Sequence, residues 1–240
     1  MVKHLHKARL FLIVIFFVAE GTAQDIPLKD LKYIWFPHPM EKNWQSSIGF
    51  LSTTLPRDIA EEIHFRVPAG QFHAIKKIGD KMYLDGRVNI QVLQNLISAG
   101  PRWATKLNDR ISMSLGNDVA YWFGIINLES IKTKGHGIQN YPSISFGYRF
   151  NKAILLSAKA ESIMNLVIKT YAGDREVATD YRLFSGSSYT IALEQPFFGK
   201  KSLTLGFRGI YTNFYWQTWT LFESFDRNIF FPQLIVGLIL

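Results

Sequence analysis

The chain ends in Ile229-Phe-Phe-Pro-Gln-Leu-Ile-Val-Gly-Leu-Ile-Leu240, and this stretch is the strongest indication of the fold class. It is long enough for one β-strand, it is mostly apolar, and no polar tail follows it. An apolar strand left at the edge of an open sheet would invite aggregation, whereas closing the sheet into a barrel removes the edge. We therefore interpret this stretch as the final strand of a closed barrel.

The other end of the chain resembles a secretion leader. Basic residues at the start are followed by an apolar core at 10–19 and by the small residues Gly21-Thr22-Ala23. A helix needs about 20 apolar residues to cross a bilayer, so this core is too short for an anchor. We expect a signal peptide over 1–23, a periplasmic N-terminal segment over 24–43 and a transmembrane β-barrel over 44–240.

Charge and cysteine content restrict the partners. The formal net charge is +8, and loss of three basic residues and one acidic residue with the leader lowers it to +6. An exported basic chain meets anionic lipid head groups and lipopolysaccharide rather than nucleic acid, so we expect lipids as partners and no nucleic acid. The chain has no Cys, which excludes disulfides.

Alternation with period two recurs after the leader and predicts strands with one apolar and one polar face. From Met82 to Val92 the even positions are mostly apolar, and Asp85, Arg87, Asn89 and Gln91 lie between them. The same pattern runs through 111–125, which we interpret as one long strand without a turn at Asn117-Asp118, because a two-residue turn would move the apolar set to the other face.

The lengths of the connections predict the topology. With the C-terminus in the periplasm, the short turns and the long outer loops fall on opposite sides, as in bacterial outer-membrane barrels. We expect outer loops near 127–140, 167–185 and 216–228, and turns near 108–110, 151–153 and 196–200. Further strands are expected near 44–55, 62–77, 81–94 and 99–107. The predicted fold is all-β, a transmembrane antiparallel up-and-down barrel of about ten strands, within a range of 8 to 12.

Aromatic residues are concentrated in the last quarter of the chain. Tyr and Trp gather at membrane interfaces because the ring is apolar and its tip is polar. We therefore predict Tyr211, Tyr215, Trp216 and Trp219 as membrane-interface aromatics. The alternative is a soluble barrel or sandwich whose core these rings fill, and it shares the same alternation.

These features together resemble the outer-membrane β-barrel proteins of Gram-negative bacteria of the Bacteroidota type. The resemblance covers the leader with its Ala23-Gln24-Asp25 junction and the amphipathic strands from about Trp44 to Leu240. It implies export to the outer membrane and insertion by the barrel assembly machinery. Many such barrels end in an aromatic residue that this machinery reads, and here the last residue is Leu240.

The polar face of the strands carries the charged and amide groups that we predict to line the lumen. One interpretation is a narrow passage or binding site for small polar or anionic solutes, and the other is mutual pairing of charges inside a filled barrel. The predicted lumen-facing residues are Asp85, Arg87, Asn89, Gln91, Arg149, Lys159, Glu161, Glu194 and Arg208.

Catalytic motifs are weak, and we predict neither catalytic residues nor a metal or cofactor. Some outer-membrane acyl hydrolases carry His-x-Ser on one strand, and none of the four histidines after the leader has Ser two positions on. A triad from distant segments, such as His136 with Ser143 and Asp174, stays open, although His136 is expected in an outer loop. These histidines are His38, His64, His73 and His136.

Two functional classes follow. The first is a non-enzymatic outer-membrane barrel that acts as a narrow channel, a binding protein or a structural protein of the envelope. The second is an outer-membrane lipid-modifying acyl hydrolase.

Overall fold

The computed structural model describes residues 31–240 apart from 57, 58, 60–65, 129–131, 151, 152, 179, 199, 200, 222 and 223. The predicted leader, residues 24–30, His64 and Lys200 lie outside the described residues.

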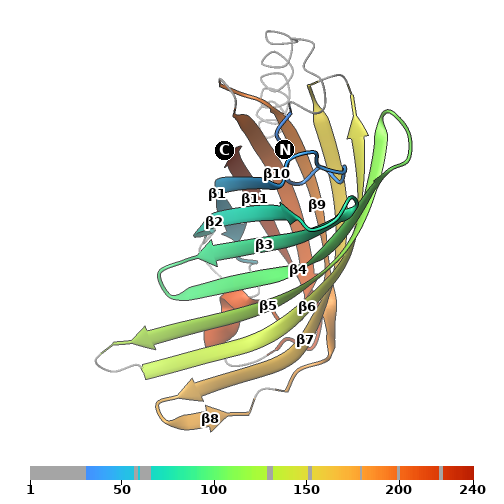
Figure 1. Ribbon diagram of the computed structural model, residues 1–240. Coiled ribbons are helices and arrows are strands. Elements are labelled where there is room, and N and C mark those ends of the chain that lie inside the picture. Colours follow the sequence, from blue (N-terminus) through green and yellow to red (C-terminus); the bar gives the residue numbers. More distant parts are fainter. Residues whose placement is uncertain are drawn as a thin grey trace, which may run out of the picture.

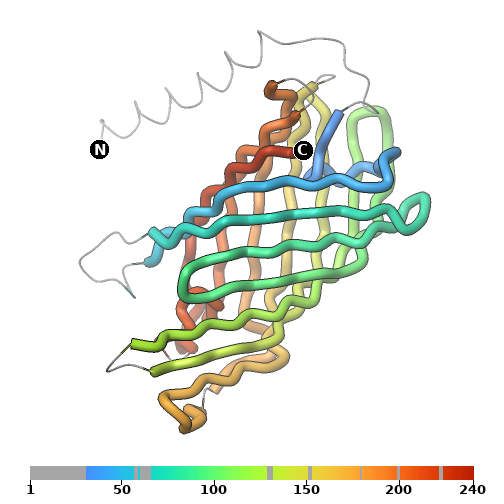
Figure 2. Tube along the Cα trace, turned by 60° about the vertical axis from the view of Figure 1, so that its left-hand side comes forward, coloured from blue at the N-terminus to red at the C-terminus, as the bar shows by residue number. Residues whose placement is uncertain are grey.

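Ten strands form a closed antiparallel barrel, in which each strand pairs with its neighbours along the chain (Figures 1 and 2). The ring closes through β1–β11, and the short β8 is an appendage that pairs with the end of β7. The strands are β1 Trp44–Thr54, β2 Arg66–Lys77, β3 Met82–Ile90, β4 Gln94–Lys106, β5 Ile111–Asn127, β6 Lys132–Arg149, β7 Leu155–Ala172, β8 Arg175–Val177, β9 Phe184–Pro196, β10 Ser202–Thr212 and β11 Ile229–Ile239.

The last strand closes the barrel as expected. On one side β11 pairs with β10, and on the other it pairs with β1, where Leu51 lies opposite Ile235 and Ser47 opposite Ile239. Strand β11 therefore has a partner strand on each side, and the apolar C-terminal stretch is not left as an open edge. The predicted all-β barrel of about ten strands is confirmed.

The two faces of the barrel differ in chemistry because successive side chains of a strand point to opposite sides. The outer face is apolar on all ten barrel strands, and most of the polar residues between these positions are buried inside. Large apolar side chains exposed on the outer face include Ile48, Phe50, Phe72, Leu84, Ile97, Leu115, Val119, Phe146, Leu166, Ile191, Phe207, Leu234 and Val236. We call this band the apolar belt.

The barrel has a turn end and a loop end. The turn end carries the connections at 78–81, 107–110, 150–154 and 197–201, and the loop end carries those at 55–65, 91–93, 128–131, 173–183 and 213–228. The single long strand predicted over 111–125 is confirmed by β5, which passes through Asn117 and Asp118 without a turn.

Two predicted outer loops are too long. Strand β6 begins at Lys132, so most of 127–140 is strand, and β7 continues to Ala172 within the predicted loop 167–185. His136 therefore lies in a strand and not in a loop. The alternation signal fades here because the outward positions of these strand ends carry Lys132, Lys134 and Lys169 rather than apolar residues. None of the helices in the described part of the chain is long and apolar enough to span a bilayer.

Candidate functional site in the barrel interior

The segment before β1 enters the barrel at the turn end (Figures 1 and 2), and its side chains are packed inside. Residues 31–40, which we call the N-terminal plug, bury Ile34 completely and leave Phe36 only 2% exposed. These side chains pack with inward residues near the turn end, including Ile75, Tyr83 and Ile239. The part of the predicted periplasmic segment that the structure describes is thus mostly packed inside the barrel.

The N-terminal plug is held by two charged side chains, one that contacts its N–H groups and one that contacts its carbonyl oxygens. Glu194 accepts hydrogen bonds from the backbone N–H groups of Ile34, Trp35 and Phe36 at 2.8, 3.0 and 2.9 Å. Arg102 donates to the carbonyl oxygens of the same three residues at 2.8, 3.3 and 3.0 Å. Because a buried backbone group without a partner is costly, this clamp lets three consecutive peptide units lie inside the barrel.

A second plug fills the loop end. Residues 213–221, which include the 3₁₀ segment η2 Trp216–Leu221, fold inward and bury Trp219 completely. Gly124 and Gly135 make room for this ring, because a Cβ atom at either position would lie 2.4 or 2.6 Å from Trp219 atoms. We call residues 213–221 the loop-end plug.

This plug corrects the prediction for three of the four interface aromatics. Tyr215, Trp216 and Trp219 are 6%, 4% and 0% exposed and pack against inward residues such as Phe231, so they do not face the membrane interface. Tyr211 lies on the outer face and is 49% exposed. The sequence pattern was misleading because a segment that folds back into a barrel needs the same amphipathic rings as one that lies at an interface.

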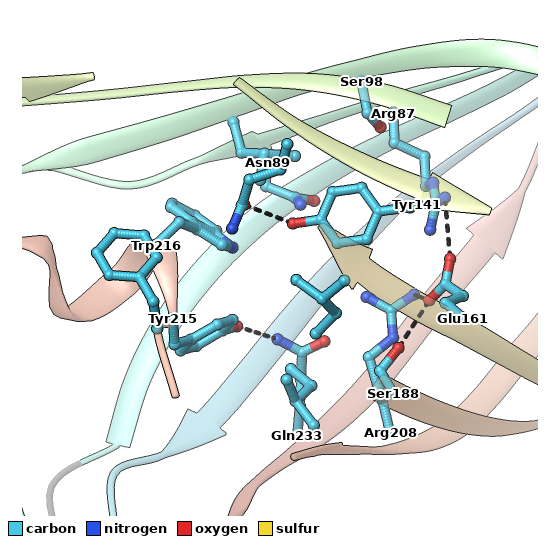
Figure 3. A pocket seen from close by; sticks show the side chains of 15 residues that line it. Arg87, Asn89, Ser98, Tyr141, Glu161, Ser188, Arg208, Tyr215, Trp216 and Gln233 are labelled. Atoms are coloured by element: carbon cyan, nitrogen blue, oxygen red, sulfur yellow. Dashed lines mark hydrogen bonds and ion pairs between the residues drawn. The ribbon is translucent and has the colours of Figure 1, made fainter. Parts of the chain in front are cut away.

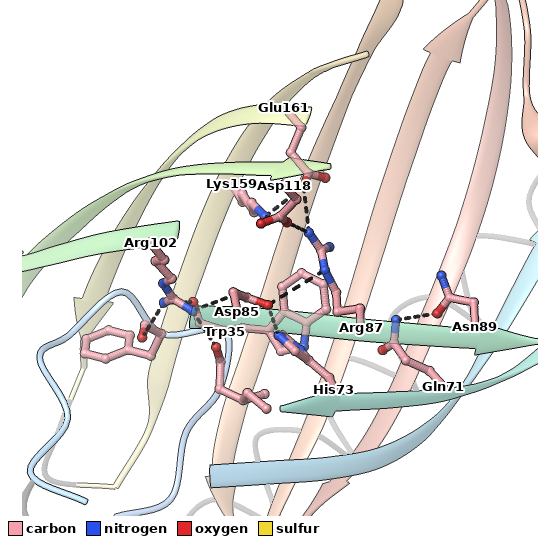
Figure 4. Close-up of polar contacts among 12 residues, drawn as sticks. Trp35, Gln71, His73, Asp85, Arg87, Asn89, Arg102, Asp118, Lys159 and Glu161 are labelled. Atoms are coloured by element: carbon pink, nitrogen blue, oxygen red, sulfur yellow. Dashed lines mark hydrogen bonds and ion pairs between the residues drawn. The ribbon is translucent and has the colours of Figure 1, made fainter. Parts of the chain in front are cut away.

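Between the plugs lies a network of buried charges (Figure 4). Arg87 is paired with Asp118 and, at 3.4 Å, with Glu161, which also accepts from Lys159 at 2.7 Å and from Arg208 at 3.2 Å.

The network continues toward the N-terminal plug through Asp85. This carboxylate lies 3.5 Å from Arg102 and 2.8 Å from Nε2 of His73. The clamp and the charge network therefore share Arg102. Buried charges are tolerated when they are paired and hydrogen-bonded, so most of these groups satisfy each other.

Most of the predicted lumen residues do lie inside the barrel. Seven of the nine form ion pairs or hydrogen bonds there, namely Asp85, Arg87, Asn89, Lys159, Glu161, Glu194 and Arg208. Arg149 is half-buried at the turn end, and Gln91 lies in the β3–β4 turn, where its amide donates to the carbonyl of Pro68 at 2.9 Å. Gln91 was misplaced because β3 ends one residue before it.

Sequence reasoning missed Arg102, Asp118 and His73 as members of the network. All three lie at inward positions of β4, β5 and β2. Asp118 lies at one of the alternate positions of β5 that carry polar residues, so the period-two pattern could have predicted it as an inward residue. The strand containing Arg102 was obscured by Pro101, and the one containing His73 by Pro68.

A cavity lies between the charge network and the loop-end plug (Figure 3). It has a volume of ≈ 50 Å³ and is lined by Arg87, Tyr141, Arg208, Trp216 and Gln233, among others. The buried Oε1 atom of Gln233 has no hydrogen-bond partner, although its Nε2 atom donates to Thr53 at 2.8 Å and to Tyr215 at 3.2 Å. This cavity therefore offers a hydrogen-bond acceptor to water or to a small polar molecule that donates a hydrogen bond.

The histidines do not form the triad considered from sequence. His136 is on the outer face of β6 and Ser143 on the inner face, because the two residues are an odd number of positions apart along the strand.

His38 does contact a serine, since its Nδ1 atom lies 2.7 Å from Oγ of Ser112. Burial, together with the positive charges of Lys106 and Arg149, lowers the pKa of His38 to about 4. Among the described residues, Ser112 is the one hydrogen-bond partner of the His38 ring, so no carboxylate orients it as in a Ser-His-Asp triad. The described residues also contain no group of three or more His, Asp or Glu that could hold a metal ion.

Comparisons with known proteins give similarity to solved barrels at low sequence identity. No protein-family model matches the chain, and no curated protein matches it. A KdgM porin in complex with disordered oligogalacturonate is 10% identical, with a TM-score of 0.38, over 80% of this chain and 97% of that one. A NanC porin is 8% identical, with a TM-score of 0.40, over 81% and 98%. LpxR from Salmonella typhimurium is 8% identical, with a TM-score of 0.39, over 80% and 99%.

Proposed function

We propose that this protein is an integral barrel of the bacterial outer membrane, exported through the leader at 1–23. The apolar belt supports this location, because it runs over all ten barrel strands while the polar side chains lie inside. A soluble barrel would place its apolar residues inside instead. Large apolar residues on every strand would be costly in water and are favourable in a hydrocarbon layer.

We further propose that the barrel is non-enzymatic and closed at rest, so that it serves as a binding or structural protein of the envelope rather than as an open channel. The observation that carries this proposal is the presence of a plug at each end. The N-terminal plug is clamped by Glu194 and Arg102, and the loop-end plug is seated by Trp219. The charges between the plugs are paired with each other.

Planar-bilayer recordings test the closed state. We expect the purified mature protein to insert without producing steady, ohmic current steps. The positive control is the double variant Glu194→Ala/Trp219→Ala, which removes the clamp from one plug and the anchor from the other and is expected to give frequent openings. Steady porin-like conductance from the wild-type protein would contradict the proposal.

The hydrolase alternative has one geometric argument in its favour, which is the contact between His38 and Ser112. A serine-directed fluorophosphonate probe distinguishes the two functions. The non-enzymatic proposal expects no labelling of the folded protein. Labelling that is lost in Ser112→Ala but kept in Ser114→Ala, a serine on the same inner face of β5, would favour the hydrolase.

A further inference from the structure

The outer face of β5, β6 and β7 carries a groove near the loop end. It has a volume of ≈ 530 Å³ and is lined by Tyr121, Phe123, Ile125, Lys134, His136 and Tyr171. Strand register brings these residues together, since His136 lies opposite both Phe123 and Lys169 and Lys134 lies opposite both Ile125 and Tyr171. The aromatic rings contact each other: His136 is stacked on Tyr171 with ring centroids 6.1 Å apart, and it is tilted against Tyr121 with centroids 6.3 Å apart.

Lys134 lines this groove, and two further lysines lie beside it on the same face. Lys134 lies over the Tyr171 ring, with Nζ 5.0 Å from the ring centroid, and Lys169 and Lys132 are exposed on the same outer face. The acidic neighbour on this face is Glu176 of β8, opposite Tyr171. Among the described residues no ion pair joins Lys132, Lys134 or Lys169 to a carboxylate, in contrast to the paired charges of the interior.

The apolar belt continues directly from the groove toward the middle of the barrel. Val119 of β5 and Leu166 of β7 are 49% and 44% exposed, and Ile138 of β6 lies between Tyr121 and Val167. A ligand that covers both regions needs anionic groups at one end and a large apolar surface at the other. Flat aromatic rings at the boundary offer apolar contact to the ring faces of a sugar.

We propose that this groove binds the phosphorylated head group of lipopolysaccharide, with Lys134, Lys169 and His136 facing its phosphates and the acyl chains lying on the belt. This site rests on the proposed membrane location, because it needs the loop end to face the outer leaflet. Basic residues beside a membrane surface attract anionic lipid head groups, and the aromatic rings favour a glycolipid over a simple phospholipid. The groove therefore selects one lipid rather than anchoring the barrel non-specifically.

Native mass spectrometry of the mature protein in dodecyl maltoside tests the site, with bis-phosphorylated lipid A as the probe. The test variant is Lys134→Gln/His136→Gln/Lys169→Gln. The matched control is Lys76→Gln/Lys81→Gln/Lys201→Gln, which removes three exposed lysines near the turn end. We expect the test variant to bind lipid A more weakly by on the order of 30-fold, the effect of two lysines at an anionic lipid surface. The control is expected to bind as the wild type does.

Two further probes separate lipid from free phosphate. The same glycolipid without phosphates and inorganic phosphate alone are both expected to bind far more weakly than lipid A. Equal binding of lipid A by the test variant and the wild type would overturn the site, and so would tight binding of inorganic phosphate alone. Heat-modifiable mobility in gels checks that each variant is folded.

The same preparation distinguishes failure of the site from failure of the proposed function. A protein that stays folded and monodisperse without detergent contradicts the membrane location itself. A barrel that needs detergent but binds lipid A equally well in all variants contradicts only the lipid site.

Discussion

Glu194 of β9 accepts a hydrogen bond from the backbone N–H of Ile34 at 2.8 Å, across 160 positions of the sequence. The carboxylate is fully buried, and it holds two further N–H groups of the N-terminal plug. A single side chain of the barrel wall thus binds the N–H groups of three consecutive residues. Hydrogen bonds to a charged group are stronger than neutral ones, so this contact stabilises the plug inside the barrel together with Arg102.

The first prediction concerns this contact. Glu194→Gln removes the charge while keeping the shape, and we expect it to weaken plug binding by about 2 kcal/mol, the scale of a buried hydrogen bond to a charged group. Limited proteolysis in detergent should then cut within 31–43 while the barrel stays intact. The control Glu41→Gln changes an exposed carboxylate just after the plug and should leave the pattern of fragments unchanged. Equal protection of the plug in Glu194→Gln would contradict the clamp.

The second prediction concerns the seat of Trp219. A side chain at Gly124 would occupy the space of the indole, so Gly124→Val should expel the loop-end plug at a cost of about 1–3 kcal/mol. The measurement is the rate at which a small water-soluble thiol reagent labels a cysteine introduced at Ser188, which lines the cavity beneath the loop-end plug. Gly70→Ala is the control, because the nearest atom to a Cβ there is 3.9 Å away. An unreactive cysteine in Gly124→Val would show that the plug tolerates the change.

The third prediction concerns the charge network. Arg87→Leu leaves Asp118 without its closest partner and Glu161 with two of its three cations, in a buried site. Breaking a buried ion pair by removing one partner costs about 3–5 kcal/mol. We expect this loss in the free energy of unfolding, measured by urea titration of the barrel in lipid vesicles.

An exposed pair provides the comparison. Lys106→Gln removes a cation from the turn at the end of β4, where Lys106 contacts Asp109 in water, and should leave the urea midpoint almost unchanged. If Arg87→Leu behaved in the same way, the interior charges would not stabilise the barrel.

The fourth prediction concerns the apolar belt. Leu234→Arg places a charge on the outer face in the middle of β11, where a lipid-facing Arg costs about 2–4 kcal/mol. Folding into vesicles should be weakened by this amount, whereas Thr204→Ser, a conservative change inside the barrel, should have little effect. Unchanged folding of Leu234→Arg would contradict a hydrocarbon environment at this position.

The fifth prediction concerns pH. The pKa of His38 is lowered to about 4 in the folded protein from 6.5, so the unfolded or released plug binds the proton more tightly. The contribution of His38 to plug binding is therefore fully present above about pH 6.5 and is lost as the pH falls toward 4. In planar bilayers we expect the frequency of brief openings to rise as the pH is lowered from 6.5 toward 4. Between pH 6.5 and 5, this rise should be smaller in His38→Gln than in the wild type. The same pH response in His38→Gln and wild type would assign the effect to other groups.

Much of the wall of the barrel could be predicted from the sequence. The alternation through 111–125 gave the correct single strand, and the apolar stretch ending at Leu240 gave the correct closing strand. Both follow from local rules, since period-two patterning sets the faces of a strand wherever one face meets an apolar environment. The ends of β6 and β7 could not be predicted in this way, because their outward residues are basic or aromatic and lose the pattern.

The contents of the barrel depend on the tertiary structure. The sequence by itself determined that Asp85, Arg87, Glu161 and Arg208 have the polar parity of their strands. Closure of the ring was needed to bring Glu161 into ion pairs with Arg87 and Arg208. It also placed Glu194 and Arg102 within hydrogen-bond distance of the backbone of Ile34. The same closure formed the space between Gly124 and Gly135 that Trp219 occupies. Parity is a property of one strand, whereas these contacts join strands far apart in the chain, and their geometry exists only after the sheet has curved back to its first strand.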